Sequence, residues 1–477
     1  MPTTIEFELD GRQVQVADDG ASLLEVLRDR LGERSPKDGC SPQGQCGCCT
    51  VLVDGAPRVA CVTPARRVAG RKVTTLTGLP DRDEWAARLV ATGGSQCGFC
   101  TPGIIMRLAA GGNLAAHLCR CTGWQTITED APIIDIRDLD AASRRATIEG
   151  HAPQRVGVAV PLGYGGFADD TSPLDAIVAV PDGRGGYAIG ETLTEARAKA
   201  EKVQGRRTTI DLRHPIDVPA GDWVRTLRTT WVEPAYLETD ASWCVPGGEP
   251  ASPLANGGAF GGKTTSPVMA DARRLADEHG RAVRVLWSRE DCVRMGPKRP
   301  PMAGGVRADG TGVVVVVRTP GIADVLAAYG VEVIEVDVPG PPTGLLRAPW
   351  MEVAMLTGAP QPGATATISD DGAHVSVRVE CGEVLDEVVL RSYCIGATHM
   401  ALGWVRSEGI AVDDAGEAHD LTIRSFGIVR PNEMPHVDVE IVAGDGPPVN
   451  GSDAVFVAVA AAEWARLGHP QDLPVAR

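Results

Sequence analysis

Nine of the thirteen cysteines lie between residues 40 and 121, and their spacing divides them into two sets. The first set is Cys40, Cys46, Cys48, Cys49 and Cys61, and the second is Cys97, Cys100, Cys119 and Cys121. Thiolates that converge from one loop, with one more from beyond a hairpin, suit a [2Fe–2S] cluster. A four-thiolate zinc site and unligated thiols are the alternatives for the first set.

The second set combines a Cys-x2-Cys turn with a Cys-x-Cys turn. This arrangement can hold a tetrahedral centre with four sulfur ligands. Zinc sites commonly have Cys-x2-Cys in both halves, so the pattern favours iron–sulfur chemistry and leaves zinc as the alternative. Two clusters on successive small domains would carry single electrons. The four scattered cysteines are expected to be small buried residues: Cys244, Cys292, Cys381 and Cys394.

The segments around the first set predict a small β-rich domain. Residues 4–16 alternate apolar and polar side chains around an Asp10-Gly11 turn, which predicts a β-hairpin. A capping box at Ser22 predicts a helix that continues to about Leu31. With strands at 50–55 and 72–76, these elements predict a ββαβ domain of the β-grasp kind.

Residues 84–123 predict a second, small helical domain, and from about residue 166 the chain has an α/β pattern. The expected helices there are 192–203 and 268–279, and the expected strands are 283–287, 313–318, 374–379 and 437–442. The fold class is thus α+β. The expected domains are 1–80, 81–127, a linker at 128–165, and 166–477.

Composition excludes several function classes. The net charge of −16 over 477 residues argues against nucleic acid as a partner, because a phosphate backbone requires a basic surface. The first residues lack the basic and apolar regions of a signal peptide, and no long apolar run predicts a membrane span. We therefore expect a cytoplasmic protein with reduced thiols.

Three phrases in the cysteine-rich region resemble the iron–sulfur subunit of the molybdenum hydroxylases, the family of xanthine dehydrogenase and aldehyde oxidoreductase. They are GQCGCCTVLVDG (44–55), QCGFCTPGIIM (96–106) and CRCTGWQTI (119–127). The resemblance implies a plant-ferredoxin-like β-grasp domain and a helical-bundle domain, each with one [2Fe–2S] cluster. The implied ligands are Cys40, Cys46, Cys49 and Cys61 for one cluster and Cys97, Cys100, Cys119 and Cys121 for the other.

The same resemblance makes Cys48 the spare cysteine and matches Gln96 to a glutamine that contacts the pterin in the family. Two departures stand out. The Cys40–Cys46 spacing is one residue longer than is common in the family, and the stretch between Cys100 and Cys119 is shorter. The second departure predicts a trimmed helical bundle with unchanged ligands.

The C-terminal part resembles the molybdopterin-binding large subunit of the family, in a shortened form. The segments that carry this likeness include WVEPAYLE (231–238), GGAFGGK (257–263), GRAVRVLWSRED (280–291), LLRAP (345–349) and the stretch 379–404. The glycine-rich segment resembles the loop beside the molybdenum cofactor. The implied molybdopterin contacts are Gly258, Phe260, Gly261 and Arg347, together with Gln96.

The family's catalytic base is a glutamate in a G-x-K-G-x-G-E motif, and Val457 occupies its place here. Valine cannot accept a proton, so no catalytic residue is assigned. Asp453 and Glu463 lie nearby in sequence and are expected at the surface. Tyr393 or Met400 stands near the place of an expected glutamine. His399 and His436 are expected to be ordinary core or surface histidines.

The leading hypothesis is an electron-transfer iron–sulfur subunit of a molybdenum hydroxylase-type oxidoreductase, with the C-terminal region as a docking domain. Its expected partners, in a hetero-oligomer, are a large chain that binds molybdopterin and another chain that carries FAD. Molybdopterin would then be bound by the large chain or shared with it. A compact, self-sufficient hydroxylase that oxidises an aldehyde or N-heterocycle is the second hypothesis. A non-catalytic assembly or redox-sensing protein is the third.

Overall fold

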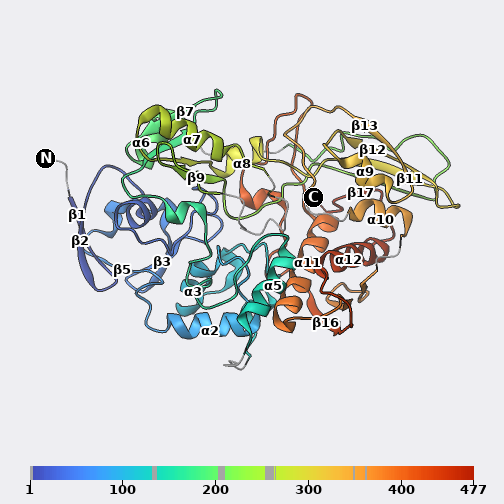
Figure 1. The fold of residues 1–477 in the computed structure, drawn as a ribbon, viewed down its shortest axis with the longest axis horizontal. Helices are drawn as coiled ribbons and strands as arrows, with labels where there is room; N and C mark the ends of the chain where they lie inside the picture. Colours follow the sequence, from blue (N-terminus) through green and yellow to red (C-terminus); the bar gives the residue numbers. More distant parts are fainter. Residues whose placement is uncertain are drawn as a thin grey trace.

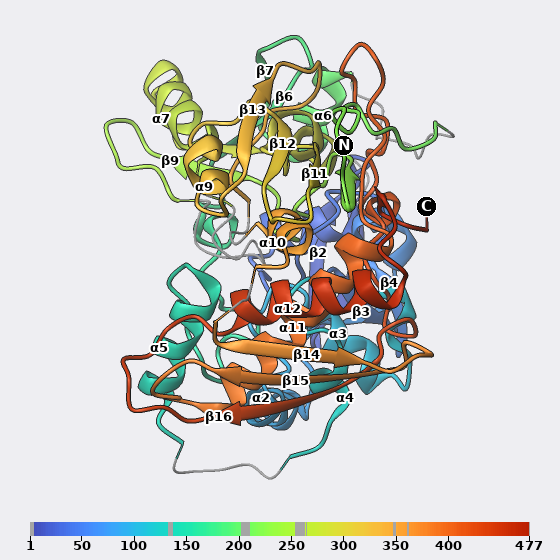
Figure 2. The ribbon, with the colours of Figure 1, turned by 90° about the vertical axis from the view of Figure 1, so that its right-hand side faces the viewer.

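The computed structural model describes residues 4–131, 137–201, 210–252, 263, 265–346, 350–359 and 362–476. These residues form four β-sheets with helices packed between and around them (Figures 1 and 2). Within these ranges, no helix has the length and apolar character needed to cross a membrane. The fold is a mixture of helices and sheets, as the sequence predicts.

The first, N-terminal sheet has the strand order β2-β1-β5-β3-β4. Its strands are β1 (Thr4–Leu9), β2 (Arg12–Ala17), β3 (Thr50–Val53), β4 (Ala56–Val59) and β5 (Lys72–Thr74). β1 and β2 form the predicted hairpin, and β1 also pairs with β5 in parallel. After the Ser22 cap, α1 (Leu23–Glu25) continues as a π-helical segment (Val26–Arg30), whose apolar side chains enter the core.

Four helices follow, and the second cysteine set lies among them. They are α2 (Arg82–Thr92), α3 (Thr101–Ala109), α4 (Gln125–Thr128) and α5 (Leu139–Gly150). The predicted helical stretch 84–123 is only partly helical, because Gly111 and Gly112 end α3. From there a 3-10 turn (Leu114–Ala116) and loops lead to Cys121. The predicted linker at 128–165 contains α5.

The second sheet has the order β7-β6-β10-β9 and helices on both faces. Its strands are β6 (Ile177–Pro181), β7 (Tyr187–Gly190), β9 (Ala241–Cys244) and β10 (Val283–Leu286). Side chains alternate along β6, so Ile177 packs with α7 (Val268–His279) and Val178 packs with α6 (Leu193–Ala200). α8 (Arg289–Met295) follows β10.

The third sheet, β13-β12-β11-β8-β17, and the fourth, β14-β15-β16, complete the described sheets. The third contains β8 (Arg225–Thr229), β11 (Met302–Val306), β12 (Gly312–Val317), β13 (Glu332–Val336) and β17 (Asp472–Leu473), with α9 (Ile322–Ala327) and α10 (Met351–Thr357) nearby. The fourth contains β14 (Ala364–Ile368), β15 (His374–Glu380) and β16 (His436–Val442). The predicted helices at 192–203 and 268–279 and the four predicted C-terminal strands are confirmed.

Two long helices, α11 (Glu387–Arg406) and α12 (Ser452–Arg466), lie beside the fourth sheet (Figure 2). α11 is buried along nearly its whole length from Val389 to Val405. A helix buried on all sides has no polar stripe, so hydrophobic periodicity does not reveal it. It reaches the N-terminal half of the chain and packs against α2 and α5.

One buried ion pair fastens the second cysteine set to the C-terminal region. Arg120, which stands between Cys119 and Cys121, donates two hydrogen bonds of 2.6 Å to the carboxylate of Glu408. Each side chain is 1% exposed. The Arg120 Nε also donates to the carbonyl oxygen of Pro234 at 3.1 Å. The Cys-x-Cys turn is thereby held from both sides by segments distant in sequence.

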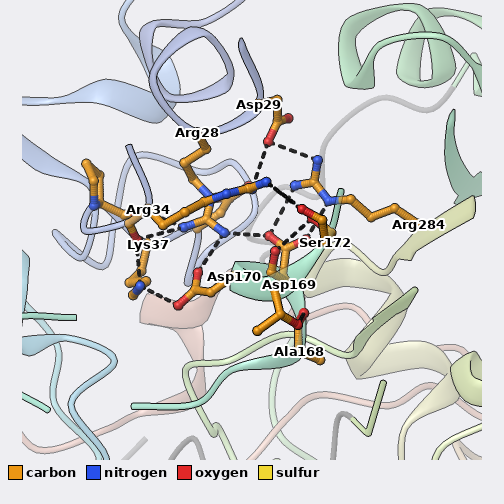
Figure 3. Close-up of polar contacts among 12 residues, drawn as sticks. Arg28, Asp29, Arg34, Lys37, Ala168, Asp169, Asp170, Ser172 and Arg284 are labelled. Carbon is orange, nitrogen blue, oxygen red and sulfur yellow. Dashed lines mark hydrogen bonds and ion pairs between the residues drawn. The ribbon is translucent and has the colours of Figure 1, made fainter. Parts of the chain in front are cut away.

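A second network joins the N-terminal sheet region to the segment before β6 (Figure 3). Arg28 donates to Asp169 at 2.7 Å and to Asp170 at 2.9 Å, and Lys37 pairs with Asp170. Arg284, on β10, also pairs with Asp169. Burial alone would raise the pKa of the Asp169 carboxyl, but Arg284 and Arg28 hold it well below its usual range. The carboxylate therefore stays ionised and keeps the two parts of the chain together.

Replacing Glu408 by glutamine tests the first of these contacts. The substitution keeps the side-chain shape but leaves the buried Arg120 charge uncompensated, so we expect the free energy of unfolding to fall by about 3–5 kcal/mol. Urea denaturation followed by circular dichroism measures the loss. Glu191→Gln is the control, because its partner Arg281 is 48% exposed and Glu191 is 66% exposed. That variant should unfold like the unaltered protein; equal losses in both would contradict the role given to Arg120 and Glu408.

Candidate metal centres

Four thiols of the first set meet in the interior. Cys40, Cys46 and Cys49 lie in the loop before β3, and Cys61 lies in a 3-10 turn after β4. The Cys40 thiol is in hydrogen-bonding contact with Cys46 and Cys61, and Cys61 also contacts Cys49. These contacts lower the pKa of Cys40 and raise the pKa of Cys61. All four cysteines are free and buried.

Backbone N–H groups point at these sulfurs. The Cys40 Sγ accepts from the N–H of Gln43 at 3.2 Å and of Gln45 at 3.5 Å, and the Cys49 Sγ accepts from the N–H of Cys61 at 3.4 Å. Such donors stabilise negative charge on thiolate sulfur. Converging free thiols with N–H donors fit a metal–thiolate centre, since a metal replaces the protons that the sulfurs otherwise share. The donor set fits a [2Fe–2S] cluster, and it fits zinc as well.

The second set converges in the same way. Cys100 caps the N-terminus of α3, and Cys97 precedes it by three residues. The Cys121 Sγ lies 3.5 Å from the Cys97 Sγ, and Cys119 contacts Cys100. The contact with Cys100 is the main cause that lowers the pKa of Cys119 to about 6. The structure thus brings together each of the two quartets that the sequence predicts.

Cys48 lies between the two quartets. Its contact with Cys46 lowers the pKa of the Cys48 thiol, but burial and the nearby sulfurs raise it overall. Those sulfurs belong to Cys40 and Cys49 of the first quartet and to Cys119 of the second. The two candidate centres are therefore neighbours. That Cys48 binds no metal stays a prediction.

His117 is a neighbour of the first quartet that the sequence analysis did not identify. A Cβ on Gly47, whose φ is +76°, would collide with its ring, and a Cβ on Gly103 of α3 would collide with the Gly47 carbonyl oxygen. Burial lowers the pKa of His117 to about 3, so the ring is neutral and accepts from the Arg107 Nε at 3.4 Å. The glycines at 47 and 103 are the only sequence signal of this close packing.

Gln96 connects the second quartet to α11. Its Nε2 donates to the Cys121 carbonyl oxygen at 3.2 Å and to the Ser392 Oγ at 2.9 Å. Its buried Oε1 has no hydrogen-bond partner among the described residues, and the side chain lines a cavity with Tyr393 and Arg137. A free acceptor at a cavity fits a group with N–H donors, such as a pterin. The pterin contact itself stays a prediction.

The other predicted molybdopterin contacts lie outside the described residues: Gly258, Phe260, Gly261 and Arg347. Lys263, at the end of the glycine-rich segment, is described and buried. Its Nζ lies 3.3 Å from an oxygen of Asp240 and 3.8 Å from one of Glu238. Burial raises the pKa of Glu238 to about 7 despite the nearby Lys263.

The position of the family's catalytic glutamate lies inside a packed helix. Val457 is on α12 and is 1% exposed. The prediction that Glu463 lies at the surface is wrong, because α12 buries it fully and Arg406 and Arg466 neutralise its charge. Asp453 is partly buried and lies 2.6 Å from the His151 Nε2.

The remaining predictions for α11 concern its interior residues. Tyr393 and Met400 are both buried on this helix. His399 is a core histidine, as expected, and its Nε2 lies 2.9 Å from the Val429 carbonyl oxygen. Burial is the main cause that lowers the pKa of His399 to about 4, so the ring is neutral. None of these three residues is placed as a proton acceptor for a substrate.

No protein-family model matches the chain. Its N-terminal quarter is similar to one subunit of the nicotinate dehydrogenase of Pseudomonas putida, with 37% identity over 146 residues that cover 25% of this chain and 87% of that protein. It is also 38% identical over 143 residues to the xanthine dehydrogenase iron-sulfur-binding subunit of Escherichia coli, covering 26% and 89% of the two chains. The aldehyde oxidoreductase of Megalodesulfovibrio gigas is 38% identical over 159 residues, but only 16% of its length is matched.

Solved structures extend the likeness to the rest of the fold. The aldehyde oxidoreductase from Desulfovibrio gigas superposes with a TM-score of 0.67 and 14% identity, covering 99% of each chain. At that identity the likeness shows the fold alone, a mixed α/β arrangement with several sheets. The sequence matches cover most of two dehydrogenase subunits at 37% and 38% identity. The chain therefore belongs to the molybdenum hydroxylase family of oxidoreductases, which includes the xanthine dehydrogenases and aldehyde oxidoreductases.

Proposed function

We propose that this chain is the electron-transfer subunit of a molybdenum hydroxylase-type complex and relays electrons from a molybdenum site through two [2Fe–2S] clusters. The observation that carries the proposal is the pair of neighbouring, buried cysteine quartets with Cys48 between them. The relatives named as iron-sulfur-binding and dehydrogenase subunits support it, because they match the same part of the chain. The buried Val457 supports placing the molybdenum chemistry on a large partner chain.

In this proposal the chain's residues hold and shield the centres. When bound, a [2Fe–2S] cluster at each quartet supplies a carrier for one electron at a time. The N–H groups of Gln43 and Gln45 stabilise charge on the Cys40 sulfur, and burial of all eight ligands excludes water. Arg120 fixes the turn that presents Cys119 and Cys121. A chain that carries FAD, or another acceptor, would receive the electrons.

The domain assignment belongs to the same proposal. Residues 1–80 would form the plant-ferredoxin-like β-grasp domain, which the five-stranded sheet with its parallel β1–β5 pair supports. Residues 81–127 would form the shortened helical domain. Residues 128–165 would connect it to the large-subunit-like region at 166–477, although α5 makes this segment more than a tether.

A compact, self-sufficient hydroxylase is the second candidate, and two observations favour it. The fold likeness to an aldehyde oxidoreductase spans nearly the whole chain, and Gln96 carries a free buried acceptor at a cavity beside α11. In that case molybdopterin would be bound by this chain, and a residue other than Val457 would accept the proton. Metal content distinguishes the two candidates.

The chain purified without partners should be brown and contain about four irons, two for each quartet. Molybdenum should be far below one per chain, because the proposal puts that cofactor on or between partner chains. Elemental analysis with visible spectroscopy gives both values. Molybdenum near one per chain would favour the compact hydroxylase, and a colourless zinc protein would exclude both redox functions. Co-expression with a large chain that carries G-x-K-G-x-G-E should yield a stable complex.

Serine substitutions test the ligand assignment. Cys121→Ser should remove one of two EPR signals of the reduced protein, because each quartet holds a separate cluster. Cys49→Ser should remove the other signal. Cys48→Ser is the matched control: it changes a buried, adjacent sulfur and should leave both signals in place. Loss of a signal in Cys48→Ser with retention in Cys49→Ser would exchange the two assignments.

A further inference from the structure

Two histidines and an aspartate gather on the exposed face of the fourth sheet, on the strands labelled β15 and β16 in Figure 2. His374 begins β15 and His436 begins β16, and the two are directly paired in the parallel register. Their ring centroids are 5.4 Å apart. Asp438 lies two residues beyond His436 and so points to the same face. The side chains of His374, His436 and Asp438 are 44%, 59% and 64% exposed.

Both rings direct a nitrogen at one carboxylate. The His374 Nε2 lies 3.0 Å from the Asp438 Oδ2, and the His436 Nε2 lies 3.2 Å from the Oδ1. The three ligand atoms all lie within 4.8 Å of one another. Imidazole nitrogen and carboxylate oxygen bind borderline divalent ions at about 2.0–2.2 Å, so small side-chain rotations would place one ion among them. Water would complete the coordination.

The surroundings leave this group available. Arg391, the cation nearest in effect to Asp438, is already held by Glu129 at 2.7 and 2.8 Å. Arg378, farther along β15, faces Glu440 of β16 at 3.6 Å. The cysteines are all buried, so no exposed thiolate competes for a soft metal ion. In the part of the chain that the structure describes, this is also the one group of three or more His, Cys, Asp or Glu side chains, Cys quartets apart, with ligand atoms at such spacing.

We propose that His374, His436 and Asp438 bind a divalent transition metal ion of the Zn²⁺, Ni²⁺ or Cu²⁺ type. The site lies where the second cysteine quartet is fastened to the fourth sheet. Val437, between two of the ligands, accepts from the Gln125 Nε2 at 3.0 Å and donates to the Gln125 Oε1 at 2.9 Å. Gln125 follows Cys121 by four residues. A bound ion would therefore join β15 to β16 at that attachment.

Titration of the oxidised, full-length holoprotein with Cu²⁺ tests the site by EPR. Oxidised [2Fe–2S] clusters and Zn²⁺ are both diamagnetic, so the copper signal is readable whichever metal the cysteine quartets hold. We expect one Cu²⁺ per chain, with a hyperfine pattern from two nitrogen ligands. His436→Ala and His374→Ala should each weaken binding by about 100-fold or more and remove the two-nitrogen pattern.

His419→Ala is the matched control. The His419 Nε2 lies 2.7 Å from an oxygen of Asp413, a comparable histidine–aspartate pair outside the three-residue group. This variant should bind Cu²⁺ like the unaltered protein, and circular dichroism should show all three variants folded. The proposal fails if the unaltered protein gives no two-nitrogen signal. It also fails if His436→Ala keeps its affinity, or if His419→Ala loses as much affinity as the site variants.

Discussion

The structure has to hold two sets of four sulfurs together in loops that have no regular hydrogen-bonding pattern of their own. Backbone groups in such loops need partners from elsewhere, because buried polar groups without hydrogen bonds are costly. The Arg120–Glu408 pair meets this need for the second quartet. Burying two charges costs desolvation that their attraction only partly offsets, so the pair contributes more to the position of the turn than to net stability. The rest of the chain is arranged around keeping these loops in place.

That constraint explains why the cysteine-bearing part is not separable from the C-terminal part. A single hydrophobic core runs from β1 to β17 and includes the cysteines of both quartets. A Cβ on Gly396 of α11 would collide with the Cys121 carbonyl oxygen, and Arg145 of α5 donates to the carbonyl oxygens of Val384 and Val449. Domain boundaries normally fall where few contacts cross. Here the boundary near residue 127 is a boundary in sequence more than in packing.

The sequence predicts those features whose signals are local. The Asp10-Gly11 hairpin, the helix at 268–279 and the strand at 313–318 follow from turn residues and periodicity. The cysteine spacing predicts two quartets for the same reason. The sequence does not predict α11, because burial on all sides removes its polar stripe. It also misses the pairing of His374 with His436, which depends on the register of two strands far apart in the chain.

Glu463 shows what α12 demands of any carboxylate. This side chain is fully buried, and it is tolerated because Arg406 and Arg466 both donate to it. Val457 is about two helical turns earlier on the same helix, where its neighbours Val455, Phe456 and Val459 are also in the core. A glutamate at 457 would bury a charge among apolar side chains, and its pKa would rise until it lost its use as a base. Valine at this position is thus the residue that the packing of α12 favours, and in the proposed complex the proton acceptor belongs to another chain.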